Sequence, residues 1–202
     1  MTTSKQLKEV ALKHFALHGY EGATLALIAD EVGIKKPSIY AHFKNKEELF
    51  IQTYLDSVKE ELNFSKEYVE INKNTVLSES LSNYITEHIK RCEENNNTKF
   101  FIRTSYFPPE KFKELIREEA NIYVDQLEQI ISLLIEKKKQ VLKHGIKPGG
   151  ATSAFLTLLD GLTVELLYGT TKRLKERREE SWNVFWQGIE KEKEKGDTKK
   201  NE

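Results

Sequence analysis

The N-terminal part of the chain carries apolar residues at helical spacing. Leu7, Ala11 and Phe15 share one face of a segment at 4–18, and Gly19 follows where a helix should end. The polar residues between them would face solvent. The pattern therefore predicts that the chain opens with a short amphipathic helix.

Two further short helices follow. The second begins after Thr24, a residue type that caps helices, and ends at Gly33, which favours the left-handed conformation of a helix end. Only two residues separate Gly33 from a third helix expected over 36–43. Asn45 then opens a fourth helix, and Glu48 stands where it would complete a capping box. A glycine turn between the second and third of three short helices is typical of a helix-turn-helix that offers its third helix to the DNA major groove. The core expected for these helices is Leu7, Phe15, Ile28, Val32, Ile39 and Phe43.

Beyond Asn45 the apolar pattern lengthens. Helices are expected over 45–70, 75–93, 98–107, 109–143, 149–172 and 177–194. The helix at 149–172 is apolar nearly all round, as is typical of a helix covered on more than one side, and a partner subunit is an expected second cover. Asp160 and Glu165 near its middle argue against a membrane span. We predict an all-α protein with a helix-turn-helix domain at 1–48, a larger helical domain at 49–194 and a charged, flexible tail at 195–202.

The charge balance directs attention to local surfaces. Lys plus Arg and Asp plus Glu each total 32, so any DNA-binding surface must be local. Four lysines and no acidic residue lie between Lys35 and Lys46, close to helix starts where backbone N–H groups favour phosphate. The only cysteine, Cys92, excludes an internal disulfide, and both a buried inert thiol and a redox-sensing role stay open.

Other classes of function find little support. The N-terminus has no secretory signal, so a cytoplasmic protein is expected. There is no phosphate-binding glycine loop and no nucleophile elbow, so an enzyme is not expected. His14 and His18 lie four residues apart but have no further ligand beside them in sequence, so we expect neither a metal site nor a cofactor.

The most informative run is TLALIADEVGIKKPSIYAHFKNKEELF, which starts at Thr24. It resembles the N-terminal signature of TetR-family regulators, T-x-x-x-I-A-x-x-A-G-V-S-x-G-x-(I/L)-Y-x-H-F-x-x-K-x-x-L, over about residues 5–52. The resemblance implies a DNA-binding domain followed by a larger helical domain that dimerises and binds a small-molecule inducer. Lys35 and Pro37 depart from the common small polar residue and glycine of that pattern, which leaves the operator sequence open.

The resemblance also implies roles for individual residues. Phosphate contacts are expected from Thr24, Tyr40, His42 and Lys46, and Lys35 lies beside them at the start of the third helix. Base edges would lie nearest Lys36, Pro37, Ser38 and Ala41. Candidate inducer-binding residues are Tyr68, Tyr84, His88, Phe101, Arg103, Phe107, Tyr123, Phe155 and Glu165.

The expected homodimer would pair the helices at 109–143 and 149–172 with their counterparts. Leu158, Leu159, Leu162 and Leu166 are the candidate interface residues. The function expected from all of this is a ligand-released repressor that binds a palindromic operator as a homodimer. An activator and a helical interaction module without DNA binding are the alternatives that the sequence leaves open.

Overall fold

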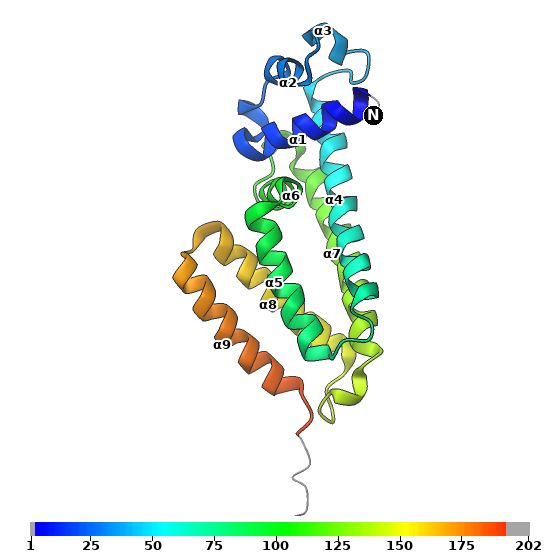
Figure 1. The fold of residues 1–202 in the computed structure, drawn as a ribbon, viewed down its shortest axis with the longest axis vertical. Helices are drawn as coiled ribbons and strands as arrows, with labels where there is room; N and C mark the ends of the chain where they lie inside the picture. Colours follow the sequence, from blue (N-terminus) through cyan, green and yellow to red (C-terminus); the bar gives the residue numbers. More distant parts are fainter. Residues whose placement is uncertain (1–2, 193–202) are drawn as a thin grey trace, which may run out of the picture. The chain divides into compact units, whose positions relative to one another are not determined.

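The computed structural model describes residues 3–192 and contains nine α-helices in that range (Figure 1). The helices are α1 Thr3–Gly22, α2 Leu25–Val32, α3 Lys36–Ile39, α4 Lys46–Ile71, α5 Leu77–Glu94, α6 Asn96–Tyr106, α7 Lys113–Glu136, α8 Pro148–Tyr168 and α9 Thr171–Ile189. Two short 3-10 turns, η1 Glu110–Phe112 and η2 Lys139–Val141, flank α7. The predicted all-α class is confirmed.

The helices divide into two compact units. One contains the chain up to Asn72 together with Tyr84–Ile130, and the other contains Lys73–Asn83 together with the chain from Ile131 onward. The predicted domain limit at residue 48 falls inside α4. The tail predicted at 195–202 lies outside the described residues.

Within the first unit, α1, α2 and α3 gather at the N-terminal end of α4 (Figure 1). The side chains that fill this cluster are Leu7, Ala11, Phe15, Ile28, Ile39 and Phe43, each at most 1% exposed. Val32, also expected in this core, is only half-buried. The predicted helical period therefore selects the buried face correctly at all but one of the expected core positions.

An aromatic cluster continues this core into the rest of the unit. Phe50 of α4 meets Phe15 of α1 edge-on with ring centroids 4.9 Å apart, and Phe100 of α6 at 5.6 Å. Phe112 of η1 stacks on Phe50 at 5.3 Å. Such pairs contribute about 0.5–1.5 kcal/mol each beyond their buried area. Of the three N-terminal helices, α1 is thus packed directly against α6 and η1.

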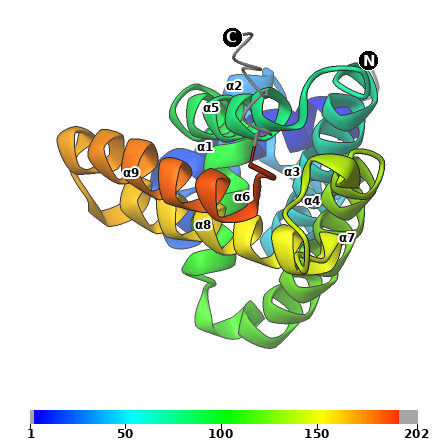
Figure 2. The ribbon, with the colours of Figure 1, turned by 90° about the horizontal axis from the view of Figure 1, so that it is seen from below.

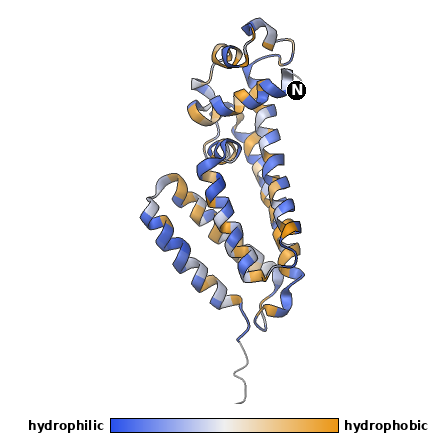
Figure 3. Ribbon diagram, in the orientation of Figure 1, coloured by the Kyte–Doolittle hydropathy of each residue, from blue (hydrophilic) through white to orange (hydrophobic). Residues whose placement is uncertain are grey.

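The second unit is built around α8 and α9, which run side by side as an antiparallel pair (Figure 2). Most of α9 is hydrophilic, whereas α8 is predominantly apolar (Figure 3). Among residues 3–192, α8 is the single helix that is long and apolar enough to cross a membrane by length and composition. It buries Phe155 and Leu159 in protein and also buries the ionisable Glu165, which is typical of a core helix.

Several helix ends differ from their predicted positions. α3 ends at Ile39, because the residues up to His42 form a tight turn in which the His42 N–H donates to the Ile39 carbonyl at 2.9 Å. α1 continues to Gly22 across a non-helical Gly19. α6 begins at Asn96, two residues before the predicted start, and α9 begins well before residue 177. The single helix expected over 109–143 is instead η1, α7 and η2.

Candidate nucleic-acid interface

The turn between α2 and α3 depends on Gly33. This residue has φ 79° and ψ 28°, and its N–H donates to the carbonyls of Ala29 and Asp30. The next N–H, of Ile34, returns to the Ala29 carbonyl at 2.9 Å. An L side chain pays a steric cost in this left-handed conformation, which is why glycine is favoured here. The turn releases the chain from α2 and starts α3 two residues later.

α3 and the turn that follows it present most of the residues that were expected to touch DNA. Ile39 and Phe43 are almost completely buried and anchor the segment to the core. The residues between and before them are exposed, and these are Lys35, Lys36, Pro37, Ser38, Tyr40, Ala41 and His42. Pro37 occupies the first turn of α3, where an amide N–H would have no helical partner. One side of this segment is therefore core and the other is an open, basic, polar surface.

Thr24 is exposed and caps α2. Its Oγ1 accepts a hydrogen bond from the Leu27 N–H at 3.2 Å, which confirms the predicted cap. The same hydroxyl retains a proton to donate. The arrangement leaves Thr24 able to cap its helix and donate to a phosphate oxygen.

Lys46 is held by neighbours that the sequence did not reveal. Its Nζ lies 4.3 Å from the centre of the Tyr20 ring and donates to the Glu21 carbonyl at 3.3 Å. Partial burial lowers the pKa of Lys46, and the Glu21 carboxylate opposes that shift. Tyr20 and Glu21 lie at the end of α1, and Lys46 is the first residue of α4. These contacts therefore hold the Lys46 side chain in place without a ligand.

The acidic residues of the same region are turned toward internal partners. Glu31 binds Lys13 at 2.8 Å and His14 at 2.9 Å, and the hydrogen bond from Lys13 is the main cause that lowers the pKa of Glu31. The Glu48 carboxylate accepts from the Lys44 N–H at 2.6 Å. The positive charge of Lys13 offsets the negative charge of Glu31. A less negative potential near α3 favours the approach of phosphate.

The predicted capping box of α4 is present in altered form. The Asn45 side chain accepts from the Glu48 N–H at 2.8 Å, as expected. Glu48 reaches back one residue further than predicted, to the N–H of Lys44 instead of that of Asn45. Both interactions use donors that the helix itself cannot satisfy.

The candidate inducer-binding residues of the first unit lie in aromatic clusters. Tyr68 meets Tyr84 edge-on at 5.1 Å, and the buried Tyr84 hydroxyl lies 2.8 Å from the hydroxyl of Ser65. Burial raises the pKa of Tyr84. Phe101 and Tyr123 lie 4.6 Å apart. These groups supply an apolar environment with hydroxyl groups at its edges.

Arg103 has a different set of partners from the one predicted. Its Nη1 donates to the carbonyls of Ala16 and Leu17 in α1, at 3.2 and 3.4 Å. Its guanidinium also lies against Gly19, where a Cβ would come within 3.1 Å of Nη2. Arg103 thus satisfies helix-end carbonyls. Phe107, another candidate, is 49% exposed at the end of α6.

A buried polar cluster was missed from sequence. Glu61 of α4 is buried and accepts from Arg91 of α5, and from Asn97 Nδ2 and Thr98 Oγ1 of α6, each at 2.8 Å. Three helices meet at this one carboxylate. Since its donors lie 30 to 37 residues away in sequence, no local pattern indicates the cluster.

His88 and Cys92 lie close to this cluster on α5. Burial, reinforced by the charge of Arg91, lowers the pKa of His88 to about 4. Cys92 Sγ lies 3.6 Å from His88 Nε2, and burial raises the thiol pKa to about 12. A thiol with such a pKa is a poor nucleophile, which favours the inert reading of Cys92.

The two remaining inducer candidates lie in the second unit. Phe155 is fully buried, and its ring centroid lies 6.0 Å from that of Phe185 in α9. Glu165 is paired with Arg173 and Arg177 of α9. Its carboxylate is therefore already compensated within the chain.

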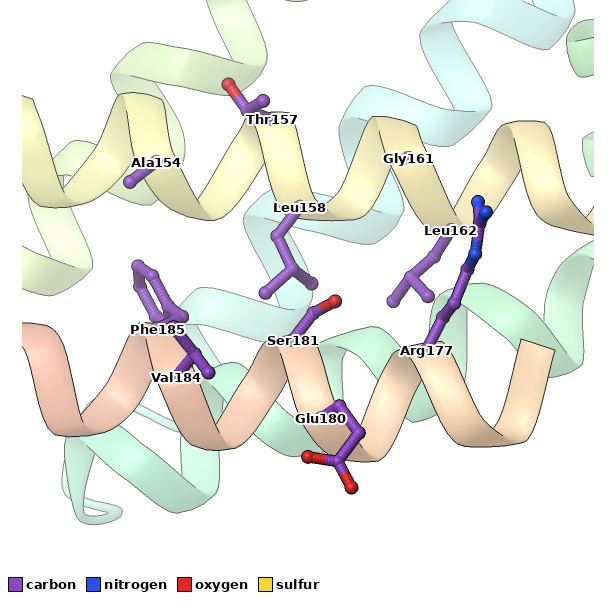
Figure 4. Close-up of a pocket in the computed structure, with 10 residues that line it drawn as sticks. All are labelled: Ala154, Thr157, Leu158, Gly161, Leu162, Arg177, Glu180, Ser181, Val184 and Phe185. Atoms are coloured by element: carbon purple, nitrogen blue, oxygen red, sulfur yellow. The ribbon is translucent and has the colours of Figure 1, made fainter. Parts of the chain in front are cut away.

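An apolar groove of about 680 Å³ runs between α8 and α9 (Figure 4). Leu158 and Leu162 line it from α8, and Val184 and Phe185 line it from α9. Of the other leucines predicted to contact a partner, Leu159 is buried within the chain and Leu166 is half-buried. Within the chain, the helix that packs beside α8 along this surface is α9.

The N-terminal helices are similar in sequence to those of known proteins. Residues 7–53 match the family described as "Bacterial regulatory proteins, tetR family". A probable acrEF/envCD operon repressor of Escherichia coli is 40% identical over 55 residues, which are 27% of this chain and 25% of that protein. The chain spans about a quarter of the length of the curated relatives it matches first.

Similarity extends further along the chain in two other cases. The fatty acid metabolism regulator protein of Bacillus subtilis is 25% identical over 122 residues, 58% of this chain and 62% of that protein. The crystal structure of the Bacillus subtilis transcriptional regulator FadR with stearoyl-CoA superimposes with a TM-score of 0.67 at 18% identity, covering 92% of this chain and 98% of that one. The fold therefore agrees along nearly the whole chain.

Proposed function

We propose that the chain is a sequence-specific DNA-binding repressor released by a small molecule, because residues 7–53 match the family described as bacterial regulatory proteins of the tetR family. The observation that carries the proposal is the exposed surface of residues 35–42, with Lys35 and Lys36 outward, while Ile39 and Phe43 anchor the segment in the core. Relatives matched over the same helices are named as repressors. Members of this family are transcription regulators and not enzymes.

In the proposed complex, phosphate contacts position the protein and base contacts select the site. Thr24, Tyr40 and His42 supply hydrogen-bond donors, and Lys46 supplies a charge at the start of α4. Lys35 adds a second charge at the start of α3. Residues 1–48 are the reading domain and residues 49–194 the regulatory domain.

The residues nearest the bases would then be those exposed on α3. Lys36 suits the acceptors of guanine, and Ser38 suits either donors or acceptors. Pro37 and Ala41 offer apolar contact, of the kind that a thymine methyl group provides. We therefore expect an operator half-site that combines guanine with thymine.

We further propose that the chain acts as a homodimer through the groove between α8 and α9. The groove is largely apolar, and Val184, which lines it, is 72% exposed. A second copy would cover the groove by adding its own α8 and α9, giving a four-helix interface. Such a dimer would present two reading domains to a palindromic operator.

The inducer is proposed to carry a long apolar chain. The candidate residues Tyr68, Tyr84, Phe101 and Tyr123 are aromatic, and the fatty acid metabolism regulator is similar well beyond the N-terminal helices. His88 is the remaining polar candidate, since Arg103 is engaged by α1. The solved relative with stearoyl-CoA makes that compound the natural first probe.

Selection of bound DNA from a random pool tests the proposal. We expect an inverted repeat to be enriched, and stearoyl-CoA to displace the full chain from it. Retention without enrichment of any sequence would refute sequence-specific binding. A helical interaction module without DNA binding would show no salt-dependent affinity for DNA. Transcription in vitro from a template carrying the selected site distinguishes a repressor from an activator. A repressor lowers the transcript yield, and an activator raises it.

A further inference from the structure

Glu165 is a buried carboxylate at the C-terminal end of α8. Its side chain is only 2% exposed, yet it receives Arg173 Nε and, at 2.8 Å, Arg177 Nη1. Both arginines come from α9 and lie four residues apart, so they share one face of that helix. A carboxylate removed from water costs several kcal/mol unless charged donors compensate it. This site is therefore unlike an exposed surface pair such as Lys172 with Glu176 at 3.8 Å.

The turn that joins α8 to α9 is shaped around this carboxylate. The Gly169 N–H donates to the Glu165 carbonyl at 2.7 Å and closes α8. A Cβ built on Gly169 would overlap the Glu165 carboxyl group and also the Glu165 carbonyl oxygen. Because the overlap includes backbone, rotation of the glutamate alone does not relieve it. The absence of a side chain at position 169 is thus what allows Glu165 to lie under the turn.

The opposite end of the α8–α9 pair is fastened separately. Leu142, which precedes α8, forms a β-bridge with Glu190, which follows α9. Lys143 Nζ adds a hydrogen bond to the Gln187 carbonyl at 3.1 Å. Between this bridge and the Glu165 ion pairs, the two helices leave the apolar groove open (Figure 4). The groove is therefore bounded by fixed points at both ends.

Arg177 connects the ion pair to the groove. It binds the buried carboxylate and also lines the groove, together with Leu162 of α8 (Figure 4). Arg173 binds the same carboxylate but does not line the groove. A change at Arg173 would therefore reach a partner subunit only by moving α9 relative to α8, whereas a change at Glu165 would also release Arg177.

We infer that Glu165 is a positioning residue for subunit pairing. By fixing Arg173 and Arg177 it sets the separation of α8 and α9, and so the shape of the surface that receives the second copy of the chain. The inference rests on the proposed homodimer through this groove. It assigns to Glu165 a role distinct from the inducer binding that the sequence suggested.

The test compares dimer dissociation constants, measured by sedimentation equilibrium on the full chain. Glu165→Gln keeps the shape of the side chain and removes its charge, and Arg173→Gln removes one partner outside the groove. We expect both to weaken the dimer, Glu165→Gln by about tenfold or more, at unchanged helix content by circular dichroism. Glu176→Gln, on the exposed face of α9, is the matched control and should leave the constant unchanged.

Val184→Lys separates failure of the inference from failure of the proposed dimer. This change places a charge in the groove without touching the ion pairs. If Val184→Lys leaves the dimer intact, the groove is not the interface and the inference falls with it. If Val184→Lys gives monomers while Glu165→Gln and Arg173→Gln dimerise like wild type, the positioning role alone is overturned. Should Glu165→Gln lose helix content, Arg173→Gln decides the question by the same criterion.

Discussion

At the scale of single residues, the sequence predicts which side chains are exposed better than it predicts which groups they bind. The residues of α3 that were expected to face DNA are exposed, because the helical period fixes which side carries Ile39 and Phe43. The partners of Lys46, Arg103 and Glu165 were not foreseen. Two of these three bind groups more than twenty residues away, at Glu21 and Ala16, and only the fold brings them together. Arg103 accordingly changes from a ligand candidate to a group that satisfies α1.

Lys46 gives the first prediction at this scale. Lys46→Ala should weaken binding to all DNA sequences and flatten the dependence of log K on log salt. With a slope of about −0.9 per phosphate neutralised, a dimer that loses one contact in each subunit should lose about 2 from that slope. Fluorescence anisotropy titrations over a salt series measure it, with Lys66→Ala of α4 as the control. An unchanged slope would show that Lys46 serves Tyr20 and Glu21 alone.

His88 gives the second prediction. Its folded pKa of about 4 lies below the ordinary histidine value of 6.5, so the unfolded chain binds the proton more readily between these values. The stability that neutral burial provides is complete above pH 6.5 and is lost as the pH falls toward 4. Between pH 7 and pH 5 this residue should cost about 2 kcal/mol of unfolding free energy.

Urea unfolding of wild type and His88→Gln at pH 7 and pH 5 measures this effect. The variant should lose less stability than wild type on acidification. His144→Gln, which changes an exposed histidine, should lose as much unfolding free energy between pH 7 and pH 5 as wild type does. Equal losses in wild type and His88→Gln would mean that His88 is not the group that titrates.

At the scale of helices, ends marked by capping residues were predicted well and ends set by tertiary contacts were not. Thr24, Gly33 and Asn45 mark the limits of α2 and the start of α4 as expected. The C-terminal end of α7 has no such signal. There Lys138, with φ −122° and ψ 19°, departs from the α-helical conformation, and its Nζ donates to the Thr75 carbonyl. A pattern that considers only neighbouring residues therefore continues the helix too far.

Asn45 gives the prediction at this scale. Asn45→Ala removes the acceptor for the Glu48 N–H and should lower the unfolding free energy by about 1 kcal/mol. Asn45→Asp retains an acceptor and should keep most of the stability. Chemical denaturation of the three proteins at one pH distinguishes them. If Ala and Asp variants were equally stable, the side-chain cap would contribute nothing to α4.

At the scale of the molecule, the fold class and the proposed DNA-binding region were predicted from the sequence, whereas the surface proposed for dimerisation required the structure. The signature in the N-terminal helices is local, because each helix there is short and ends at a recognisable residue. The α8–α9 groove combines residues such as Leu158 and Val184, which lie on two helices. The sequence predicts a dimer interface from the helices at 109–143 and 149–172, and that pairing stays a prediction.

The most direct measurement is a hydroxyl-radical footprint of the full chain on its selected operator. A homodimer that inserts two copies of α3 should protect two symmetric patches one helical turn apart, about 10 base pairs between centres. Ala41→Glu, which places an acid on the exposed turn directly after α3, should abolish both patches together. A footprint that is uniform along the DNA, or that survives Ala41→Glu unchanged, would contradict recognition of DNA through α3.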